Sequence, residues 1–355
     1  MSTKQFSGEL SVSENRSVRF RTAYDDAGLI ALTNTTYPDK EISKREYLNW
    51  EYDANPDGKA ILAMEERTTY YAGQYVVLPR RYFINDRVCL GSLSVNTLTH
   101  PKARGQGVFP GLAELVYRKC DEDGVEFTIG FPNEASRKGF QKALHFTSLP
   151  DLGLYVRPLS FIRSGFNVLF KRKAKDGSDI DLAAEKVTGI ELLDLNKDKA
   201  EYEQFLPLFN RSERKTTYRS AEFMDWRYCQ IPLRKYSLLK EITNGRISAI
   251  LAFRARYIYG LRCGILVDVM TNGAAGAGKN LLSYIHKLSV RNKLDLLLYA
   301  GSNESTETKV VHSSGFFKIS RTFLPQQITP IIRMHNGKLP DVNGWHFSFG
   351  DGDVF

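Results

Sequence analysis

Hydrophobic and polar positions along the chain predict short strands and amphipathic helices in mixed order. Strand-like apolar runs fall at residues 18–22, 60–64, 75–78 and 88–95. An amphipathic helix follows, because apolar residues recur there at the three- and four-residue spacing that buries one face: Val108, Leu112, Leu115 and Val116. A strand at 126–130 and a short helix from Asn133 come next. This order predicts a mixed α/β fold with helices packed on a sheet.

The order of elements occurs twice, because the chain carries an internal repeat. Residues 46–52 read Glu-Tyr-Leu-Asn-Trp-Glu-Tyr, and residues 222–228 read Glu-Phe-Met-Asp-Trp-Arg-Tyr. A proline follows four positions after each segment. Further matches keep the same order along the chain: Gly105-Gln-Gly107 with Gly276-Ala-Gly278, and Asn133–Glu134 with Asn303–Glu304. The repeat indicates a duplicated domain.

The join between the copies falls in residues 171–185, which are charged, contain Gly and Ser, and lack apolar periodicity. We predict a first domain at residues 1–172, a linker at 173–185 and a second domain at 186–355. Trp50 and Trp226 are expected to anchor the cores of the two copies, with lining of an acceptor site as the alternative.

Composition adds limits to this picture. Hydrophobic residues make up 42% of the 355 residues and charged residues 25%, as in soluble globular proteins. No run approaches the roughly 20 apolar residues that cross a bilayer, so no membrane insertion is expected. The first 17 residues lack the apolar run of a secretory signal, and the four cysteines form no CxxC pair. We expect a cytoplasmic protein with reduced core thiols.

The net charge of +9 favours phosphate-bearing ligands, or else is only a solvated basic surface. The basic residues are spread along the chain rather than gathered in a stripe. We therefore expect no nucleic-acid partner, and we expect a monomer.

A glycine loop between a predicted strand and a predicted helix is the main candidate for chemistry. Residues 98–109 read Leu-Thr-His-Pro-Lys-Ala-Arg-Gly-Gln-Gly-Val-Phe. Backbone amides in such a loop, a helix N-terminus and a fixed cation at Arg104 together predict a pyrophosphate cradle. The alternative is a turn that needs glycine for steric reasons alone. The loop is neither GxGxxG nor GxxxxGK[ST], which does not support a dinucleotide or P-loop site.

This loop resembles the acyl-CoA motif of the GNAT acyltransferase superfamily, whose wording is aliphatic-x-Pro-x-x-Arg-Gly-x-Gly-aliphatic. The slots are filled by Thr99, Pro101, Arg104, Gly105, Gln106, Gly107 and Val108. The resemblance implies two tandem GNAT-like domains, acyl-CoA as co-substrate and no metal. It also implies a set of CoA-binding residues: Leu98, Thr99, Arg104, Gly105, Gln106, Gly107, Val108, Phe109, Asn133 and Ser136.

Departures from the family pattern change what is expected of each copy. Phe140 stands where many members carry a tyrosine that protonates the leaving thiolate. The second-copy loop at 271–279 lacks both the arginine and the proline. We therefore expect the first copy to bind acyl-CoA and the second to complete the acceptor site, as in tandem GNAT enzymes of the FemX-like kind.

The implied reaction is direct attack of an acceptor amine on a thioester, for which a base or a water must take a proton. Asn96 and its repeat partner Asp268 lie on the strands that precede the two loops, and they are the candidate catalytic residues. If the halves pack about a pseudo-twofold axis, both could face one cleft. A buried aspartate satisfied by the backbone or by an arginine is the alternative for Asp268.

The C-terminal segment, residues 345–353, ends in Gly-Asp-Gly-Asp after an aromatic run. A turn is favoured there over a metal, sugar or amine site. The segment is similar to the tails of GNAT-like proteins that N-acylate nucleotide-linked amino sugars, such as a dTDP-3-amino-3,6-dideoxyhexose, in surface-polysaccharide synthesis. The resemblance implies transfer of an acetyl or hydroxybutyryl group to such a sugar. The alternatives are an aminoacyl-tRNA-dependent transferase and a non-catalytic acyl-CoA-binding module.

Overall fold

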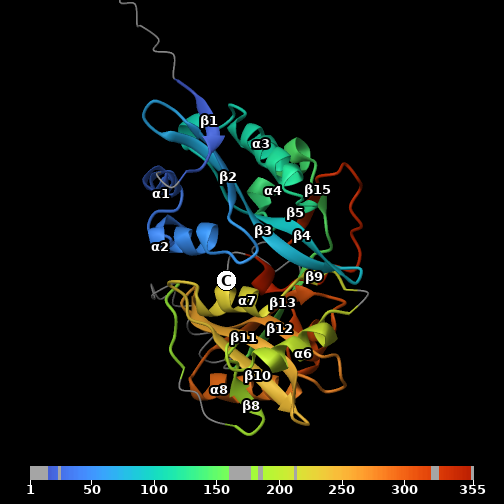
Figure 1. Ribbon diagram of the computed structural model, residues 1–355. Coiled ribbons are helices and arrows are strands. Elements are labelled where there is room, and N and C mark those ends of the chain that lie inside the picture. Colours follow the sequence, from blue (N-terminus) through green and yellow to red (C-terminus); the bar gives the residue numbers. More distant parts are fainter. Residues whose placement is uncertain are drawn as a thin grey trace, which may run out of the picture.

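The computed structural model describes residues 15–22, 25–159, 177–182, 187–211, 214–320 and 328–352. Two mixed sheets follow one another along the molecule, each with helices packed against it (Figure 1). The first is formed mainly by the N-terminal half of the chain and the second mainly by the C-terminal half. The mixed α/β fold predicted from the hydrophobic pattern is confirmed.

The first sheet has the strand order β1-β2-β3-β4-β5-β15-β6, with β9 paired to β3. Its strands in the described residues are β1 Ser17–Phe20, β2 Ile61–Glu66, β3 Tyr71–Ile84, β4 Arg87–Thr99, β5 Phe127–Gly130, β15 Ile331–Met334, β6 Thr147–Ser148 and β9 Thr216–Thr217. Strands β3 and β4 run well past the predicted runs at 75–78 and 88–95, because their pairing continues along the whole hairpin.

The second sheet has the order β14-β7-β13-β12-β11-β10-β8. Its strands in the described residues are β14 Phe317–Lys318, β7 Leu152–Pro158, β13 Leu296–Ser302, β12 Leu261–Thr271, β11 Arg246–Ile258, β10 Ser237–Thr243 and β8 Ile190–Leu192. In both sheets the one parallel contact between described strands joins equivalent strands, β4 with β5 and β12 with β13.

The helices of the two halves also correspond. The described ones are α1 Asp26–Asn34, α2 Arg45–Leu48, α3 Val108–Glu122, α4 Glu134–Leu144, α6 Lys199–Phe209, α7 Ala221–Met224, α8 Lys279–Arg291 and α9 Thr306–Ser313. Helix α3 buries the predicted face, including Val108, Leu112 and Val116, against the first sheet. All four cysteines are free, and three are buried, but Cys229 is exposed and is not the core thiol that we expected.

Each sheet is completed from the other half of the chain, the second by β7 and the first by β15 and the short β9. Strand β7 pairs antiparallel with β13, from Leu152 opposite Ser302 to Pro158 opposite Leu296. Strand β15 pairs antiparallel with β5, from Ile331 opposite Gly130 to Met334 opposite Phe127. The repeat in the sequence gives no sign of this exchange. The domain limits at 1–172 and 186–355 stay a prediction for the chain, since the two sheets do not divide strictly at that point.

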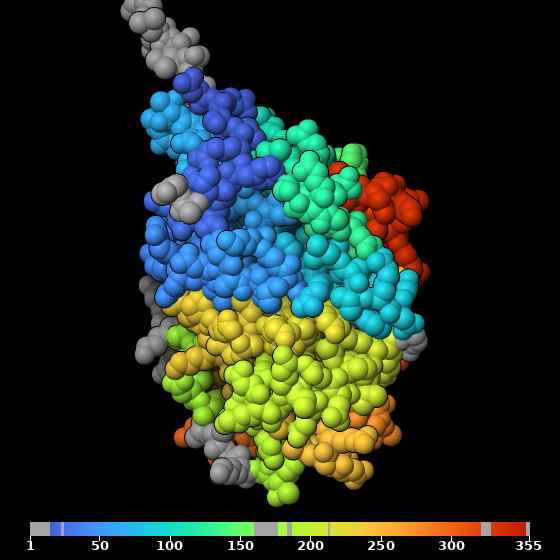
Figure 2. All heavy atoms as spheres, in the orientation of Figure 1, coloured from blue at the N-terminus to red at the C-terminus, as the bar shows by residue number. Residues whose placement is uncertain are grey.

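The two repeat tryptophans meet at the junction of the halves, where α2 and α7 face each other in Figure 1. Each lies in a π-helical turn that directly follows its short helix, Asn49–Asp53 and Asp225–Cys229. The rings of Trp50 and Trp226 stack with centroids 4.6 Å apart. Each indole N–H donates to the other residue's carbonyl, at 2.8 and 2.9 Å. The pair is thus a buried anchor shared by both copies. In Figure 2 the surfaces of the two halves are in continuous contact along this junction.

Candidate functional site

The candidate site is a cavity of about 510 Å³ in the first copy, at the point where β4 and β5 separate. The two strands pair only from Ser92 opposite Thr128 to Ser94 opposite Gly130. Beyond Ser94, β4 continues beside β3 to Thr99, whereas β5 ends at Gly130. The predicted site residues that line the cavity are Asn96, Leu98, Thr99, Arg104, Phe109, Asn133 and Ser136.

The glycine loop lies at the end of this opening and leads into α3. Gly105 and Gly107 both have φ of 76°, a left-handed conformation that favours glycine. Helix α3 begins directly after Gly107, which has no side chain that could cap the first turn. Its free N–H groups therefore provide a partial positive charge next to Arg104, as the sequence predicted for an anion site.

Four of the predicted CoA-binding residues do not line the cavity. Gly105, Gln106 and Gly107 form the loop that precedes α3, and the amide oxygen of Gln106 accepts a hydrogen bond from Arg67 at 2.7 Å. Val108 is 3% exposed and packs into the core of the first copy. The side chain of Val108 is therefore a core residue, and only its backbone is placed to meet a ligand.

The start of α4 forms the opposite wall of the cavity. Asn133 caps this helix, because its Oδ1 accepts hydrogen bonds from the backbone N–H and the hydroxyl of Ser136 at 2.9 and 3.0 Å. Phe140, which replaces the tyrosine of many GNAT proteins, is 6% exposed and packs against Phe109 and Tyr75. The Tyr75 hydroxyl is itself buried against Tyr117, and burial raises the pKa of Tyr75. Neither position supplies an acid to the cavity.

Asn96 connects the cavity to the tryptophan segment. It has φ of 46° and lies where β4 shifts register against β3 between Gln74 and Val76. Its amide nitrogen donates to the carboxylate of Glu51 and, at 3.0 Å, to the hydroxyl of Tyr52. The side chain of Asn96 is a hydrogen-bond donor held in place, and an amide has no basic nitrogen. Its assignment as a catalytic residue stays a prediction.

Asp268, the repeat partner of Asn96, is 2% exposed and is not among the described residues that line the cavity. Arg219 donates to both its carboxylate oxygens, at 2.6 and 3.1 Å. The hydroxyls of Tyr228 and Ser348 donate to the same oxygens. Burial raises the pKa of Asp268, and the guanidinium of Arg219 opposes this rise. These contacts favour the alternative of a buried aspartate satisfied by an arginine, and the expected catalytic function stays a prediction.

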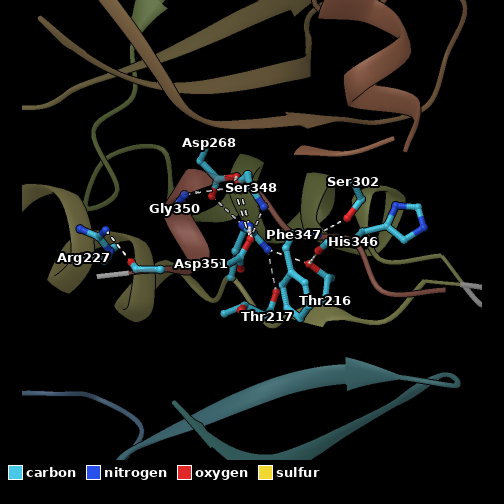
Figure 3. A network of polar contacts seen from close by, with 12 residues as sticks. Thr216, Thr217, Arg227, Asp268, Ser302, His346, Phe347, Ser348, Gly350 and Asp351 are labelled. Atoms are coloured by element: carbon cyan, nitrogen blue, oxygen red, sulfur yellow. Dashed lines mark hydrogen bonds and ion pairs between the residues drawn. The ribbon is translucent and has the colours of Figure 1, made fainter. Parts of the chain in front are cut away.

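The opening of the second sheet is filled by the C-terminal segment. Strands β12 and β13 pair from Cys263 opposite Leu296 to Leu266 opposite Tyr299, and then part. There the segment enters, with Ser348 bridged to Gly301 and the carbonyl of Phe347 accepting from the N–H of Ser302. Figure 3 shows Asp268, Ser348 and Asp351 pointing toward one another.

The C-terminal segment forms the turn that the sequence favoured. Residues Phe349–Asp351 are a 3₁₀ turn, in which the side chains of Ser348 and Asp351 cap each other's backbone. Asp351 is 2% exposed and accepts from Arg219 at 3.0 Å. Among the residues that the structure describes, no group of three or more His, Cys, Asp and Glu is placed to hold a metal ion. None of the described helices is long and apolar enough to cross a membrane.

Sequence reasoning missed part of the cavity wall. Thr36 and Tyr37, after α1, and Phe131, after β5, also line it. Thr36 and Tyr37 belong to a segment without a motif, so only the folded chain brings them to the site, and Phe131 fills no slot of the motif that includes Asn133. Glu51, which accepts a hydrogen bond from Asn96, was missed as well, although it lies in the repeated tryptophan segment.

No family model matches the chain, and no curated protein matches it in sequence. Solved structures do share its architecture. A conserved protein from Enterococcus faecalis V583, described as a probable N-acyltransferase, superposes with a TM-score of 0.64 at 8% identity, over 90% of this chain and 72% of that one. A GCN5-related N-acetyltransferase from Anabaena variabilis ATCC 29413 gives 0.60 at 12% identity, over 91% and 73%. An N-myristoyltransferase of Saccharomyces cerevisiae with bound myristoyl-CoA gives 0.59 at 13% identity, over 89% and 78%.

This chain has a tandem GNAT fold. At these identities the likeness shows the fold alone, and it does not distinguish a FemX-like enzyme from an enzyme that acts on sugars. Within the tandem GNAT fold the open cavity belongs to the first copy, in which the sequence motif placed acyl-CoA.

Proposed function

We propose that the protein is an acyl-CoA-dependent N-acyltransferase that binds its donor in the cavity of the first copy. The observation that carries this proposal is the opening between β4 and β5, which leads to the first turn of α3 beside Arg104. The helix turn and the guanidinium suit a pyrophosphate. The apolar side chains of Val95, Leu98 and Phe109 in the same wall suit the pantetheine arm.

The reaction is a single displacement at the thioester carbonyl. The neutral acceptor amine forms the N–C bond, the C–S bond breaks, and the thiolate of CoA takes up a proton. The amine gives a proton to water or to a base during this step. The irregular backbone at Asn96, where β4 leaves its register with β3, provides candidate amides to stabilise the oxyanion.

Tyr37 is our candidate for the group that protonates the thiolate, because it is the tyrosine among the described residues that line the cavity. We expect Tyr37→Phe to lower kcat on the order of 100-fold with little change in the affinity for CoA. Steady-state kinetics combined with CoA titration measure the two separately. An unchanged kcat would remove Tyr37 from the mechanism.

The acceptor that we propose is the amino group of a nucleotide-linked amino sugar, such as a dTDP-3-amino-3,6-dideoxyhexose, acylated with an acetyl or hydroxybutyryl group in surface-polysaccharide synthesis. The similarity of the C-terminal segment supports this class. The net charge of +9 is consistent with it, since donor and acceptor would both carry pyrophosphate.

The decisive experiment combines binding with turnover. Release of free thiol is followed with acetyl-, hydroxybutyryl- and myristoyl-CoA against a panel of amino-sugar nucleotides, and calorimetry gives the affinity for CoA. Arg104→Glu should weaken CoA binding about 100-fold, since it replaces a charge-assisted contact with repulsion. Arg118→Glu, an equal charge change at an exposed position of α3, is the matched control.

Three results would contradict parts of this proposal. No affinity of the wild type for any acyl-CoA would refute it and would favour the aminoacyl-tRNA-dependent alternative. Binding without turnover on any acceptor would favour the non-catalytic acyl-CoA module, for which Phe140 in place of the family's tyrosine is the supporting observation. Equal effects of Arg104→Glu and Arg118→Glu would place the pyrophosphate elsewhere.

A further inference from the structure

The helix that follows the glycine loop is capped differently in the two copies. In the second copy, the carboxylate of Glu241 on β10 lies against the first turn of α8. It accepts hydrogen bonds from the backbone N–H groups of Gly278 at 3.2 Å and Leu281 at 2.8 Å. Glu241 is 2% exposed, and the hydroxyl of Ser248 also donates to it at 3.0 Å. The place that an anion would take on this helix is therefore occupied by the protein's own carboxylate.

The first copy has a glutamate at the equivalent position. Glu65 on β2 precedes Glu241 by the same 176 positions that separate the two tryptophans, and both strands shift register directly after the glutamate. Glu65 is also 2% exposed. Its carboxylate is bound by two arginines and does not cap α3.

Arg67 is the nearer of these arginines. Its Nε donates to Oε1 of Glu65 at 2.9 Å, and its terminal nitrogens donate to the hydroxyl of Tyr70 and to the amide oxygen of Gln106 in the glycine loop. Arg16, which is half exposed, contacts the second oxygen of Glu65 at 3.0 Å. Arg67 thus connects the glutamate to the loop.

The second copy lacks this arginine. Thr243 stands at the position equivalent to Arg67, and its hydroxyl meets Ser248 at 3.0 Å. The helix N–H groups differ as well. Pro110 in α3 is equivalent to Leu281 in α8, and proline has no N–H that could donate to a carboxylate. The two copies therefore direct the same buried glutamate to different partners.

We infer that Arg67 is a positioning residue of the donor site, which holds the carboxylate of Glu65 away from the first turn of α3 and so keeps that turn open to the pyrophosphate of CoA. This inference rests on the proposed function. The physical reason is the sign of the charge: a carboxylate at the loop would compete with the ligand for the same amides and would repel its phosphates. Hydrogen bonds from Arg16 and Arg67 outweigh burial and lower the pKa of Glu65, so the group stays ionised at neutral pH.

Two variants and a control test this inference. Arg67→Thr copies the second repeat, Arg67→Thr combined with Glu65→Gln removes the carboxylate as well, and Arg118→Thr removes a cation from an exposed position of α3. The probes are CoA and inorganic pyrophosphate, titrated by calorimetry at low salt. Thermal unfolding followed by circular dichroism checks that each variant is folded.

We expect Arg67→Thr to weaken CoA binding at least tenfold and Arg118→Thr to change it less than twofold. The double variant should return to within about threefold of the wild type, since the competing carboxylate is gone. Failure of Glu65→Gln to restore binding would overturn the inference, because Arg67 would then act on the ligand through its own charge. An unchanged affinity of Arg67→Thr would overturn it as well.

The failure of the proposed function gives a different pattern. If the wild type binds pyrophosphate but neither CoA nor acyl-CoA, the proposed function falls, and the pyrophosphate titrations of the same variants decide the inference. If the wild type binds neither probe, both fall.

Discussion

The two copies of the repeat differ most at the place where their sheets open. In the first copy the opening between β4 and β5 is a cavity of about 510 Å³, and Asn96 lies at its wall. In the second copy the opening between β12 and β13 holds the turn Phe349–Asp351, and Asp268 lies under it in contact with Arg219. One scaffold therefore carries an open site and a site filled by its own chain.

The two copies differ in more than the binding motif. The second copy also has internal partners for the groups that a ligand would meet. Asp351 and Ser348 satisfy Arg219 and Asp268, and Glu241 satisfies the amides of α8. These internal contacts stabilise the second copy next to the junction. The first copy keeps a cavity whose polar groups can form hydrogen bonds to a ligand.

Arg219→Leu is expected to have the largest effect on stability, because it removes the cation that holds the C-terminal turn in the second copy. It leaves two buried carboxylates, those of Asp268 and Asp351, without their shared cation. We expect a loss of about 3–5 kcal/mol in the free energy of unfolding, measured by urea denaturation. Arg118→Leu, at an exposed site, should change it by less than about 0.5 kcal/mol. A loss for Arg219→Leu as small as that of the control would show that the turn carries little stability.

Acidification is expected to lower the stability of the contact between β5 and β15, the strand that the second half contributes to the first sheet. His335 follows β15, and its Nε2 meets the hydroxyl of Thr128 on β5 at 2.9 Å. Burial, with help from Arg333, lowers the pKa of His335 to about 4. The folded state therefore favours the neutral ring, whereas the unfolded state takes up a proton below about pH 6.5. Its contribution to stability is complete above that pH and is lost as the pH falls toward 4.

The pH effect can be isolated with His335→Gln. Between pH 7 and pH 5 we expect the wild type to lose about 2 kcal/mol more than this variant, as measured by urea denaturation at each pH. Parallel profiles for the two proteins would contradict the expectation and would assign the acid sensitivity to other groups.

Trp50→Phe and Trp226→Phe should have the smallest effects, and they test how symmetric the two copies are at the junction. Each removes one indole N–H and leaves the opposite carbonyl without its donor. We expect each to cost about 1–2 kcal/mol, and the two values to agree within error. A double-mutant cycle gives their coupling through the stacked rings. If only one variant lost stability, the two reciprocal hydrogen bonds would contribute unequally to the free energy of unfolding.

The part of the site that a motif encodes could be predicted from the sequence. Leu98, Thr99 and Arg104 were placed by the loop and its resemblance, and they do line one cavity. Tyr37 could not be predicted, because it reaches the cavity from a segment far from the loop that belongs to no local pattern. Phe131 lies two positions before Asn133 but fills no slot of the motif. The repeat likewise predicted two equivalent tryptophans, but not that each would donate to the other.

Asp268 shows why a residue type in a strand does not determine its function. An aspartate inside an apolar strand signals either a perturbed acid or a paired ion, and the choice depends on residues far along the chain. Its partner Arg219 lies 49 positions before it and Ser348 lies 80 positions after it. Such contacts are set by tertiary packing, which local periodicity does not encode.

The exchange of β7 and β15 also has a consequence for synthesis of the chain on the ribosome. Strand β5 pairs with β4 on one side and waits for β15 on the other, and β6 joins this sheet through β15. The first copy therefore cannot complete its sheet when its own half has been translated. It keeps an unpaired edge until residues 331–334 leave the exit tunnel, after nearly all of the second copy has been made. Separating the halves at the predicted linker would deprive the first sheet of β15 and β9 and the second sheet of β7. We therefore expect the two copies to fold as one unit.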